Sequence, residues 1–203
     1  MIAWFIGAAL ALPPALLGAD GPMWVGTVPP DAGLPIVAVV DPQSGALIVE
    51  STGRDGRLLR WDGSVWTLDG AALDPETPAA GHRVNGGQLM ASETLLGSGT
   101  QYDYDEEGRL VGFRWGNGEQ LTVRYESGGR VAEMIGPGTR RMQLGWTNGL
   151  RWTDALGRTV QRTQTDVGPV RTVTVSDALG RQVITRYRKR DDGWALTGWT
   201  DPR

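Results

Sequence analysis

The only histidine of the chain, His82, is the residue best suited to acid–base chemistry. The sequence contains no cysteine, which excludes a Cys-His dyad and a thiolate metal site. A Ser-His-Asp triad would have to use His82, but no G-x-S-x-G element is present. The nearest match, Gly97-Ser98-Gly99, is typical of a flexible loop. We therefore expect a protein that is not an enzyme, with no catalytic residues.

An acidic stretch at residues 103–107 is the one segment that could bind a metal ion. Asp103, Asp105 and Glu107, followed by Gly108, match positions 1, 3, 5 and 6 of an EF-hand loop. Position 12 is Arg114, where that loop needs a bidentate glutamate. We expect no metal site and no cofactor.

Tryptophan is abundant, with nine copies, and its indole ring could stack on a sugar. Trp115, Trp146 and Trp152 are the candidates for ligand stacking. The other interpretation is that the tryptophans fill the core of thin sheets, as large aromatic side chains usually do.

A short pattern that occurs four times indicates which elements hold these residues. Each copy has an acid, two variable residues, a glycine and an arginine, and the acids are 21, 28 and 23 residues apart. The copies are Tyr104, Asp105, Gly108 and Arg109; Tyr125, Glu126, Gly129 and Arg130; Thr153, Asp154, Gly157 and Arg158; and Ser176, Asp177, Gly180 and Arg181.

The pattern predicts a hairpin turn. An aspartate at the first position can accept a bond from the backbone two residues on, and a glycine at the fourth can adopt a positive φ. The flanking segments alternate apolar and polar residues: Leu121, Val123 and Tyr125 share one side of a strand. From residue 101 onward we expect about ten antiparallel strands.

These residues resemble the YD repeats of the RHS family, which includes bacterial polymorphic toxins, wall-associated proteins, insecticidal-toxin shells and teneurins. The stretches that carry the resemblance are YDYDEEGRL, RYESGGRVAEMIGPG, TDALGRT and SDALGRQ, within residues 99–203. Only the first copy has the full Tyr-Asp pair. The resemblance implies an all-β fold, an antiparallel meander of YD-repeat hairpins forming part of a spiralling β-shell.

The rest of the chain divides into three parts. Residues 1–19 are apolar and end in small residues, which indicates a signal peptide or a hydrophobic anchor, although no basic residue precedes Arg54. Residues 20–70 contain short apolar runs between turn signals and predict a small β region. Residues 71–98 read as a linker, in which residues 88–96 could be a short helix or strands.

The expected function is structural. The resemblance implies part of a secreted or cell-surface RHS-type shell that encloses or presents a toxin or adhesion module. Its partners would be that module or further YD-repeat sheet. The alternative is an extracellular carbohydrate- or protein-binding module that contacts surface glycans through exposed tryptophans. With a net charge of −3, no nucleic-acid partner is expected, and the apolar N-terminus is too short for a stable membrane span. A secreted or cell-envelope location in bacteria follows if residues 1–19 are a signal peptide.

Overall fold

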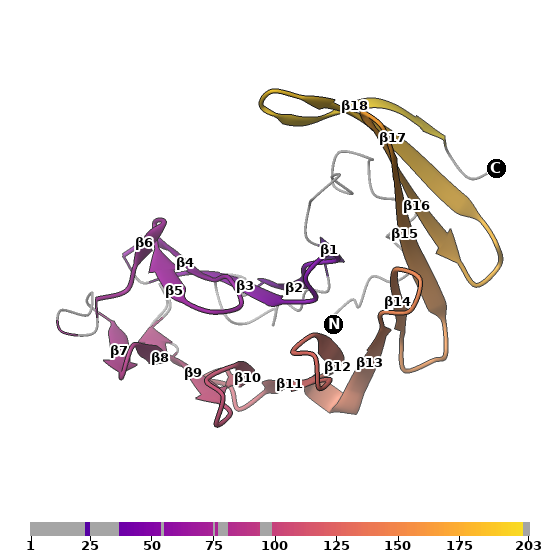
Figure 1. Cartoon of the computed structure of the whole chain (residues 1–203). Helices are drawn as coiled ribbons and strands as arrows, with labels where there is room; N and C mark the ends of the chain where they lie inside the picture. Colours follow the sequence, from indigo (N-terminus) through magenta and orange to yellow (C-terminus); the bar gives the residue numbers. More distant parts are fainter. Residues whose placement is uncertain are drawn as a thin grey trace. The chain divides into compact units, whose positions relative to one another are not determined.

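The protein is all-β, as predicted, and its strands are antiparallel and joined mainly by hairpins (Figure 1). The computed structural model describes residues 23–24, 37–53, 55–74, 76, 81–93 and 99–200. The N-terminal segment 1–19 lies outside these residues. Within the described ranges, no helix has the length and apolar character needed to cross a membrane.

The strands are β1 (Met23–Trp24), β2 (Val37–Val40), β3 (Leu47–Thr52), β4 (Leu58–Trp61), β5 (Trp66–Leu68), β6 (Ala71–Ala72), β7 (His82–Asn85), β8 (Gln88–Glu93), β9 (Gly99–Tyr104), β10 (Leu110–Arg114), β11 (Gln120–Tyr125), β12 (Val131–Gly136), β13 (Arg140–Gly145), β14 (Leu150–Thr153), β15 (Thr159–Val167), β16 (Val170–Asp177), β17 (Gln182–Arg190) and β18 (Gly193–Thr200). The ten strands β9 to β18 agree with the number expected from the sequence. The described chain forms two compact units, with the boundary after residue 140.

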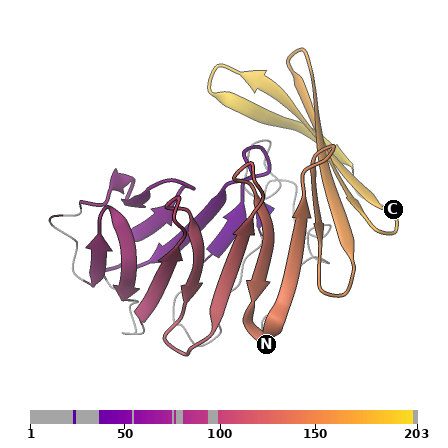
Figure 2. The same ribbon diagram turned by 60° about the horizontal axis from the view of Figure 1, so that its bottom comes forward.

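The unit that ends at residue 140 contains two facing sheets, which Figures 1 and 2 show as indigo strands lying across magenta ones. One sheet has the strand order β1 to β6, and strands β7 to β12 belong to the second sheet, each in sequence order. The turn before β3 meets the second sheet, because the Val131 amide donates to the Gly45 carbonyl at 2.9 Å. Gly45 has φ 77°, and a Cβ there would collide with the side chain of Arg130. This contact therefore requires glycine.

Aromatic rings fill the space between these two sheets. Trp66 on β5 packs against Tyr102 on β9 with a centroid distance of 4.8 Å, and Tyr102 continues to Phe113 at 6.3 Å. Phe113 then contacts Trp115 at 5.0 Å. Trp66 is fully buried, so this row of rings forms the centre of the core. Aromatic pairs contribute about 0.5–1.5 kcal/mol each beyond the area they bury.

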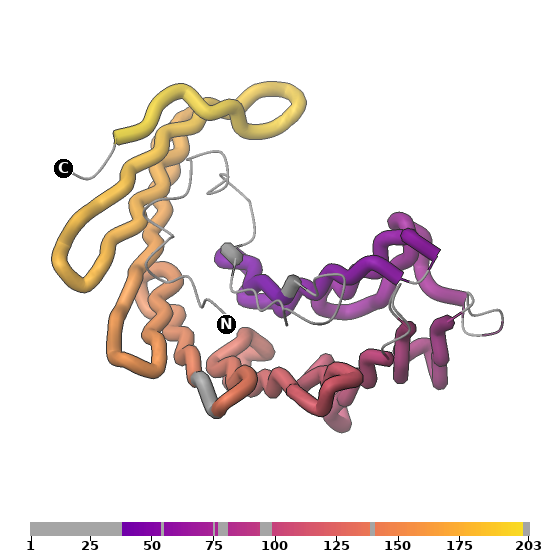
Figure 3. Tube along the Cα trace, turned by 180° about the vertical axis from the view of Figure 1, so that it is seen from behind, coloured from indigo at the N-terminus to yellow at the C-terminus, as the bar shows by residue number. Residues whose placement is uncertain are grey.

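The unit that begins at residue 141 contains the longest strands, β15 to β18, which the trace in Figure 3 shows in orange to yellow. Val173, Val175 and Val183 are buried on one side of this sheet. On the same side Arg171 stacks over Trp194, with 4.1 Å from guanidinium carbon to ring centroid. The opposite side carries mainly threonine and arginine, which gives the two-sided pattern of an antiparallel sheet.

The prediction of a linker at residues 71–98 is wrong for its described part, which contains β6, β7 and β8. The proline and glycine residues within residues 71–81 suggested a linker, but Asn85-Gly86-Gly87 is a hairpin signal. Gly86 and Gly87 have φ of 55° and 81°, so they make the tight turn between β7 and β8. Of the alternatives left open for residues 88–96, the strand is correct for residues 88–93.

Candidate functional site

Three of the four repeat turns have almost the same geometry. Asp154 caps its turn by accepting the amide of Arg158 at 2.8 Å on one oxygen and the guanidinium Nε at 2.6 Å on the other. Asp177 and Arg181 repeat these bonds at 2.9 and 2.6 Å, and Asp105 and Arg109 at 2.8 and 2.8 Å. The turn glycines Gly108, Gly157 and Gly180 have φ of 80°, 77° and 77°. The acid and the arginine therefore act together as a fixed turn clamp.

The clamp lowers the pKa of two of its aspartates, Asp154 and Asp177. Burial by itself would raise the pKa of Asp154, but hydrogen bonds from the Arg158 side chain and from the amides of Arg158 and Leu156 lower it below its usual value. The pKa of Asp177 is lowered by the same balance of burial against Arg181 and the amide of Leu179. These carboxylates are committed to structure rather than to proton transfer.

The second copy keeps the backbone of the turn with a different acid. The Glu126 amide donates to the Arg130 carbonyl and the Gly129 amide donates to the Glu126 carbonyl, each at 2.9 Å. Gly129 has φ 77°, as in the other copies. Within the described residues, no hydrogen bond of the Glu126 carboxylate is present. The extra methylene of glutamate therefore costs this turn the side-chain part of the clamp.

The tyrosines of the first two copies tie neighbouring strands together. The Tyr104 hydroxyl donates to the carbonyl of Leu89 and the Tyr125 hydroxyl to that of Leu110, each at 2.7 Å and across 15 residues. The Arg109 guanidinium lies over the Tyr125 ring at 4.8 Å, so the arginine of one copy packs on the tyrosine of the next. The sequence pattern identified these residues as part of the repeat, but it did not predict these contacts.

The candidate stacking tryptophans do not form an exposed platform. Trp115 and Trp152 are buried, at 4% and 5% exposure, which corrects their assignment as a surface for ligands. Trp146 is half-buried. Among the tryptophans whose burial the structure describes, the exposed one is Trp199, at 53%, on the edge strand β18. Hydrophobic burial, the other interpretation considered for the tryptophans, accounts for Trp115 and Trp152.

A cavity of about 800 Å³ opens near Trp115, where β7 and β9 begin and β8 ends. His82 lies in its wall rather than in a linker and is only 8% exposed. Both ring nitrogens of His82 and the indole nitrogen of Trp115 are buried without a hydrogen-bond partner among the described residues. The cavity therefore contains polar atoms that could bond a small molecule or ordered water.

Among the described residues that line the cavity, no nucleophile is paired with a base. His82 and Ser92 are direct partners across β7 and β8. The Ser92 hydroxyl, however, shares its hydrogen bond with the Tyr102 hydroxyl at 2.9 Å. Burial raises the pKa of Tyr102 to about 12 in spite of that bond, so this tyrosine stays neutral at ordinary pH. We find no hydrolytic arrangement in this wall of the cavity.

The acidic stretch 103–107 is spread over a strand and a turn. Asp105 and Glu107 both bond Arg109, at 2.8 and 3.2 Å, while Asp103 lies on β9. Among the residues with described positions, no three acidic or imidazole side chains converge on a point where a metal ion could bind. The sequence analysis did not predict that His82 and Trp115 are buried, because β7 was not expected there.

No protein-family model matches this chain, and no curated protein is similar to it.

Proposed function

We propose that this protein is a non-enzymatic structural protein, a β-sheet wall of the RHS type that encloses or presents a toxin or adhesion module outside the bacterial cell. The observation that carries the proposal is the recurring clamp: Asp105, Asp154 and Asp177 each bond the arginine four residues later in the same way. A turn that is rebuilt at intervals of 20 to 30 residues suits an extendable sheet rather than a single reaction site.

Exposed apolar tips on these turns support a packing role. Leu156 and Leu179 occupy the same position in two turns of identical sequence, DALGR, and each is 79% exposed. Covering an exposed leucine with a partner surface would remove its apolar area from water, which is favourable. We assign them to packing against further repeat sheet or against the enclosed module.

The wall function is tested by measuring whether the protein protects an attached linker from proteolysis. A compact reporter domain is fused after Arg203 through a linker that contains one site for a sequence-specific protease. We expect the linker to be cut at least about tenfold more slowly than in the free reporter. The control is the same fusion carrying Asp154→Ala and Asp177→Ala, which removes two clamps and should restore cleavage. Equal cleavage of the fusion and the free reporter would reject the wall function.

The second candidate is an extracellular carbohydrate- or protein-binding module, which the exposure of Trp199 favours. Trp199 and Leu196 lie on the same side of the edge strand β18, at 53% and 44% exposure. A glycan panel read by tryptophan fluorescence tests this candidate, with Trp199→Ala as the control. A fluorescence change that persists in the variant would assign the binding elsewhere.

A further inference from the structure

The two parts of the chain carry opposite charge. Residues 24–140 contain nine Arg and sixteen Asp or Glu, a net charge of −7. Residues 141–203 contain eleven Arg or Lys and six Asp or Glu, a net charge of +5. The overall value of −3 therefore conceals a basic region. Such an asymmetry indicates interaction with an acidic partner.

The acids of this basic region are already neutralised at particular arginines. Asp154 pairs with Arg158 and Asp177 with Arg181 in the turn clamps. Asp166 holds the largely buried Arg171, with Nε and Nη2 at 2.9 and 2.8 Å from its two oxygens. The remaining described acids, Asp191 and Asp192, lie at the tip of the β17–β18 hairpin. The other arginines and the lysine of the region therefore outnumber the acids that are left to pair with them.

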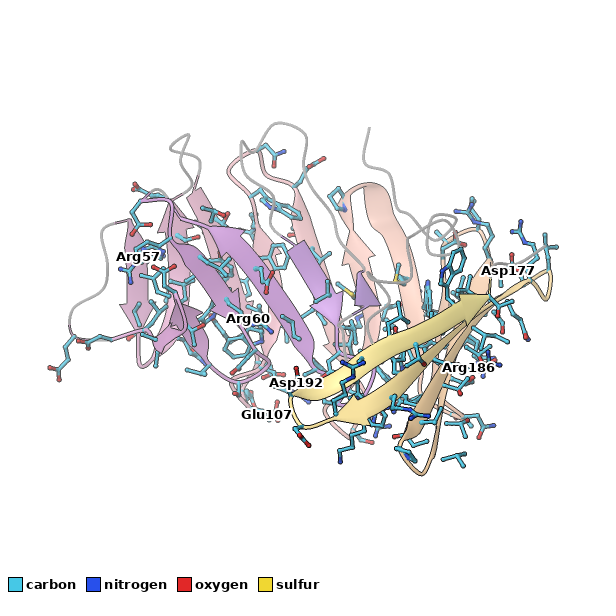
Figure 4. The ribbon with its side chains drawn as sticks, turned by 90° about the horizontal axis from the view of Figure 1, so that it is seen from above. Arg57, Arg60, Glu107, Asp177, Arg186 and Asp192 are labelled. Atoms are coloured by element: carbon cyan, nitrogen blue, oxygen red, sulfur yellow. The ribbon has the colours of Figure 1, made fainter. Side chains whose placement is uncertain are left out.

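Three of those cations stand in a row along β17. Arg186, Arg188 and Arg190 are two residues apart, so they point to one side of the strand at intervals of about 6.6 Å. All three are exposed, and Figure 4 labels Arg186 on this strand. Across residues 141–200, which the structure describes without a gap, none of the three guanidinium groups has an ion pair or hydrogen bond. The facing residues on β18 are Gly198, Ala195 and Gly193.

A group of threonine hydroxyls lies beside the arginine row. On β16 the neighbour of Arg186 is Thr172, and Thr172 faces Thr165 on β15. Thr174 faces Thr163 in the same way, so four threonines share this side of the sheet with the arginines. We call this surface the arginine face: Arg186, Arg188, Arg190, Thr163, Thr165, Thr172 and Thr174. The strand pairings place no carboxylate and no aromatic ring from β15, β16 or β17 on it.

We infer that the arginine face binds an acidic polysaccharide. Guanidinium groups bind carboxylate or sulfate through paired, charge-assisted hydrogen bonds. Threonine hydroxyls both donate and accept, which matches the hydroxyls of a sugar chain. Single-stranded nucleic acid is disfavoured because its binding uses aromatic stacking, which this face lacks. No aromatic or leucine side chain from β15, β16 or β17 lies on this side of the sheet, and its apolar residues are Val167, Val170 and Ile184, which makes a membrane a poorer fit.

Binding of the full chain to polygalacturonate tests the inference, with dextran as the neutral polymer. We expect binding to polygalacturonate alone, and weaker binding as NaCl rises from about 50 to 500 mM. Arg186→Ser with Arg188→Ser should weaken binding at least about tenfold. The matched control is Arg83→Ser with Arg114→Ser, which makes the same change in net charge in the other unit and should alter affinity less than about twofold.

Thr163→Val with Thr172→Val keeps the shape of the face and removes two hydroxyls, and should weaken binding several-fold. Near-ultraviolet circular dichroism verifies that each variant is folded. Three results would overturn the inference: equal loss in both arginine variants, equal binding of dextran, or tighter binding of duplex DNA or phosphatidylglycerol vesicles than of polygalacturonate. The assay is independent of linker protection, so its failure would leave the wall function standing.

Discussion

The hydroxyl of Tyr125 donates to the carbonyl of Leu110 at 2.7 Å, across the pair formed by β11 and β10. Tyr104 makes the same bond to Leu89 at the same separation of 15 residues. The strand opposite each tyrosine thus gains a bond that the backbone ladder does not supply. This contact explains why a tyrosine, rather than another β-forming residue, precedes the acid in the first two copies.

Removing these hydroxyls should destabilise the protein by different amounts. Tyr125→Phe loses one bond, and we expect the free energy of unfolding to fall by about 1 kcal/mol. Tyr104 also accepts the indole N–H of the fully buried Trp66 at 2.6 Å. Tyr104→Phe leaves that donor unpaired and should cost about 2–3 kcal/mol. Urea unfolding measures both values, and an equal cost for the two variants would contradict the argument.

The turn glycines are required by backbone conformation rather than by space. Gly180 has φ 77°, and a Cβ there would meet nothing within 4 Å. Gly180→Ala should therefore cost about 1–2 kcal/mol through the left-handed backbone alone. Gly198→Ala is the control, since Gly198 has open space and no positive φ, and it should change stability by less than about 0.5 kcal/mol. Thermal unfolding compares them, and Gly180→Asn should recover part of the loss because asparagine tolerates this conformation.

Local pattern was sufficient to predict the hairpins but not the core. The turn signature depends on neighbouring residues, so the positions of Asp154 and Gly157 could be read directly. The facing of β5 on β9 depends on contacts such as Trp66 with Tyr104, 38 residues apart, which no local pattern encodes. The prediction of a linker at residues 71–98 was wrong for a related reason. The composition suggested a linker, whereas β8 is a strand because it pairs with β9.

The candidate-site residues that were predicted wrongly also depend on contacts between distant parts of the chain. Trp115 and Trp152 lie at or near strand ends, where sequence alone cannot distinguish a buried ring from an exposed one. His82 was placed outside the folded sheets because β7 had not been recognised. The side of the strand occupied by Arg186 and Arg188 follows from their spacing of two. Their lack of acidic partners, however, depends on which arginines Asp166 and Asp177 already hold.

Buried tyrosines should limit stability at high pH. Burial raises the pKa of Tyr102 from 10.0 to about 12, and burial likewise raises the pKa of Tyr104 and Tyr125. Above pH 10 the unfolded chain loses these protons before the folded one does. Stability is therefore complete below pH 10 and falls as pH rises toward 12, by roughly 3 kcal/mol from Tyr102 alone.

Urea unfolding at pH 9, 10, 11 and 12 measures this loss. Arginine remains charged throughout the range, so the turn clamps do not titrate with it. In Tyr102→Phe the stability at pH 9 is lower, because Ser92 loses its partner, but the decline from pH 10 to 12 should be smaller than in the parent. An equally steep decline in the variant would show that the burial of Tyr102 is not the cause.

The glutamate turn offers a substitution that should stabilise the protein. In the other three copies the aspartate accepts the amide of the residue four positions later, at 2.8 to 2.9 Å. Glu126 has the same backbone bonds, but its carboxylate makes none. Glu126→Asp brings the oxygen into the position that Asp154 occupies, and we expect a gain of about 0.5–1 kcal/mol. Glu106→Asp, at an exposed position that makes no clamp, is the matched control and should be neutral. Differential scanning calorimetry distinguishes the two, and an unchanged Tm for Glu126→Asp would show that the clamp adds no net stability to this turn.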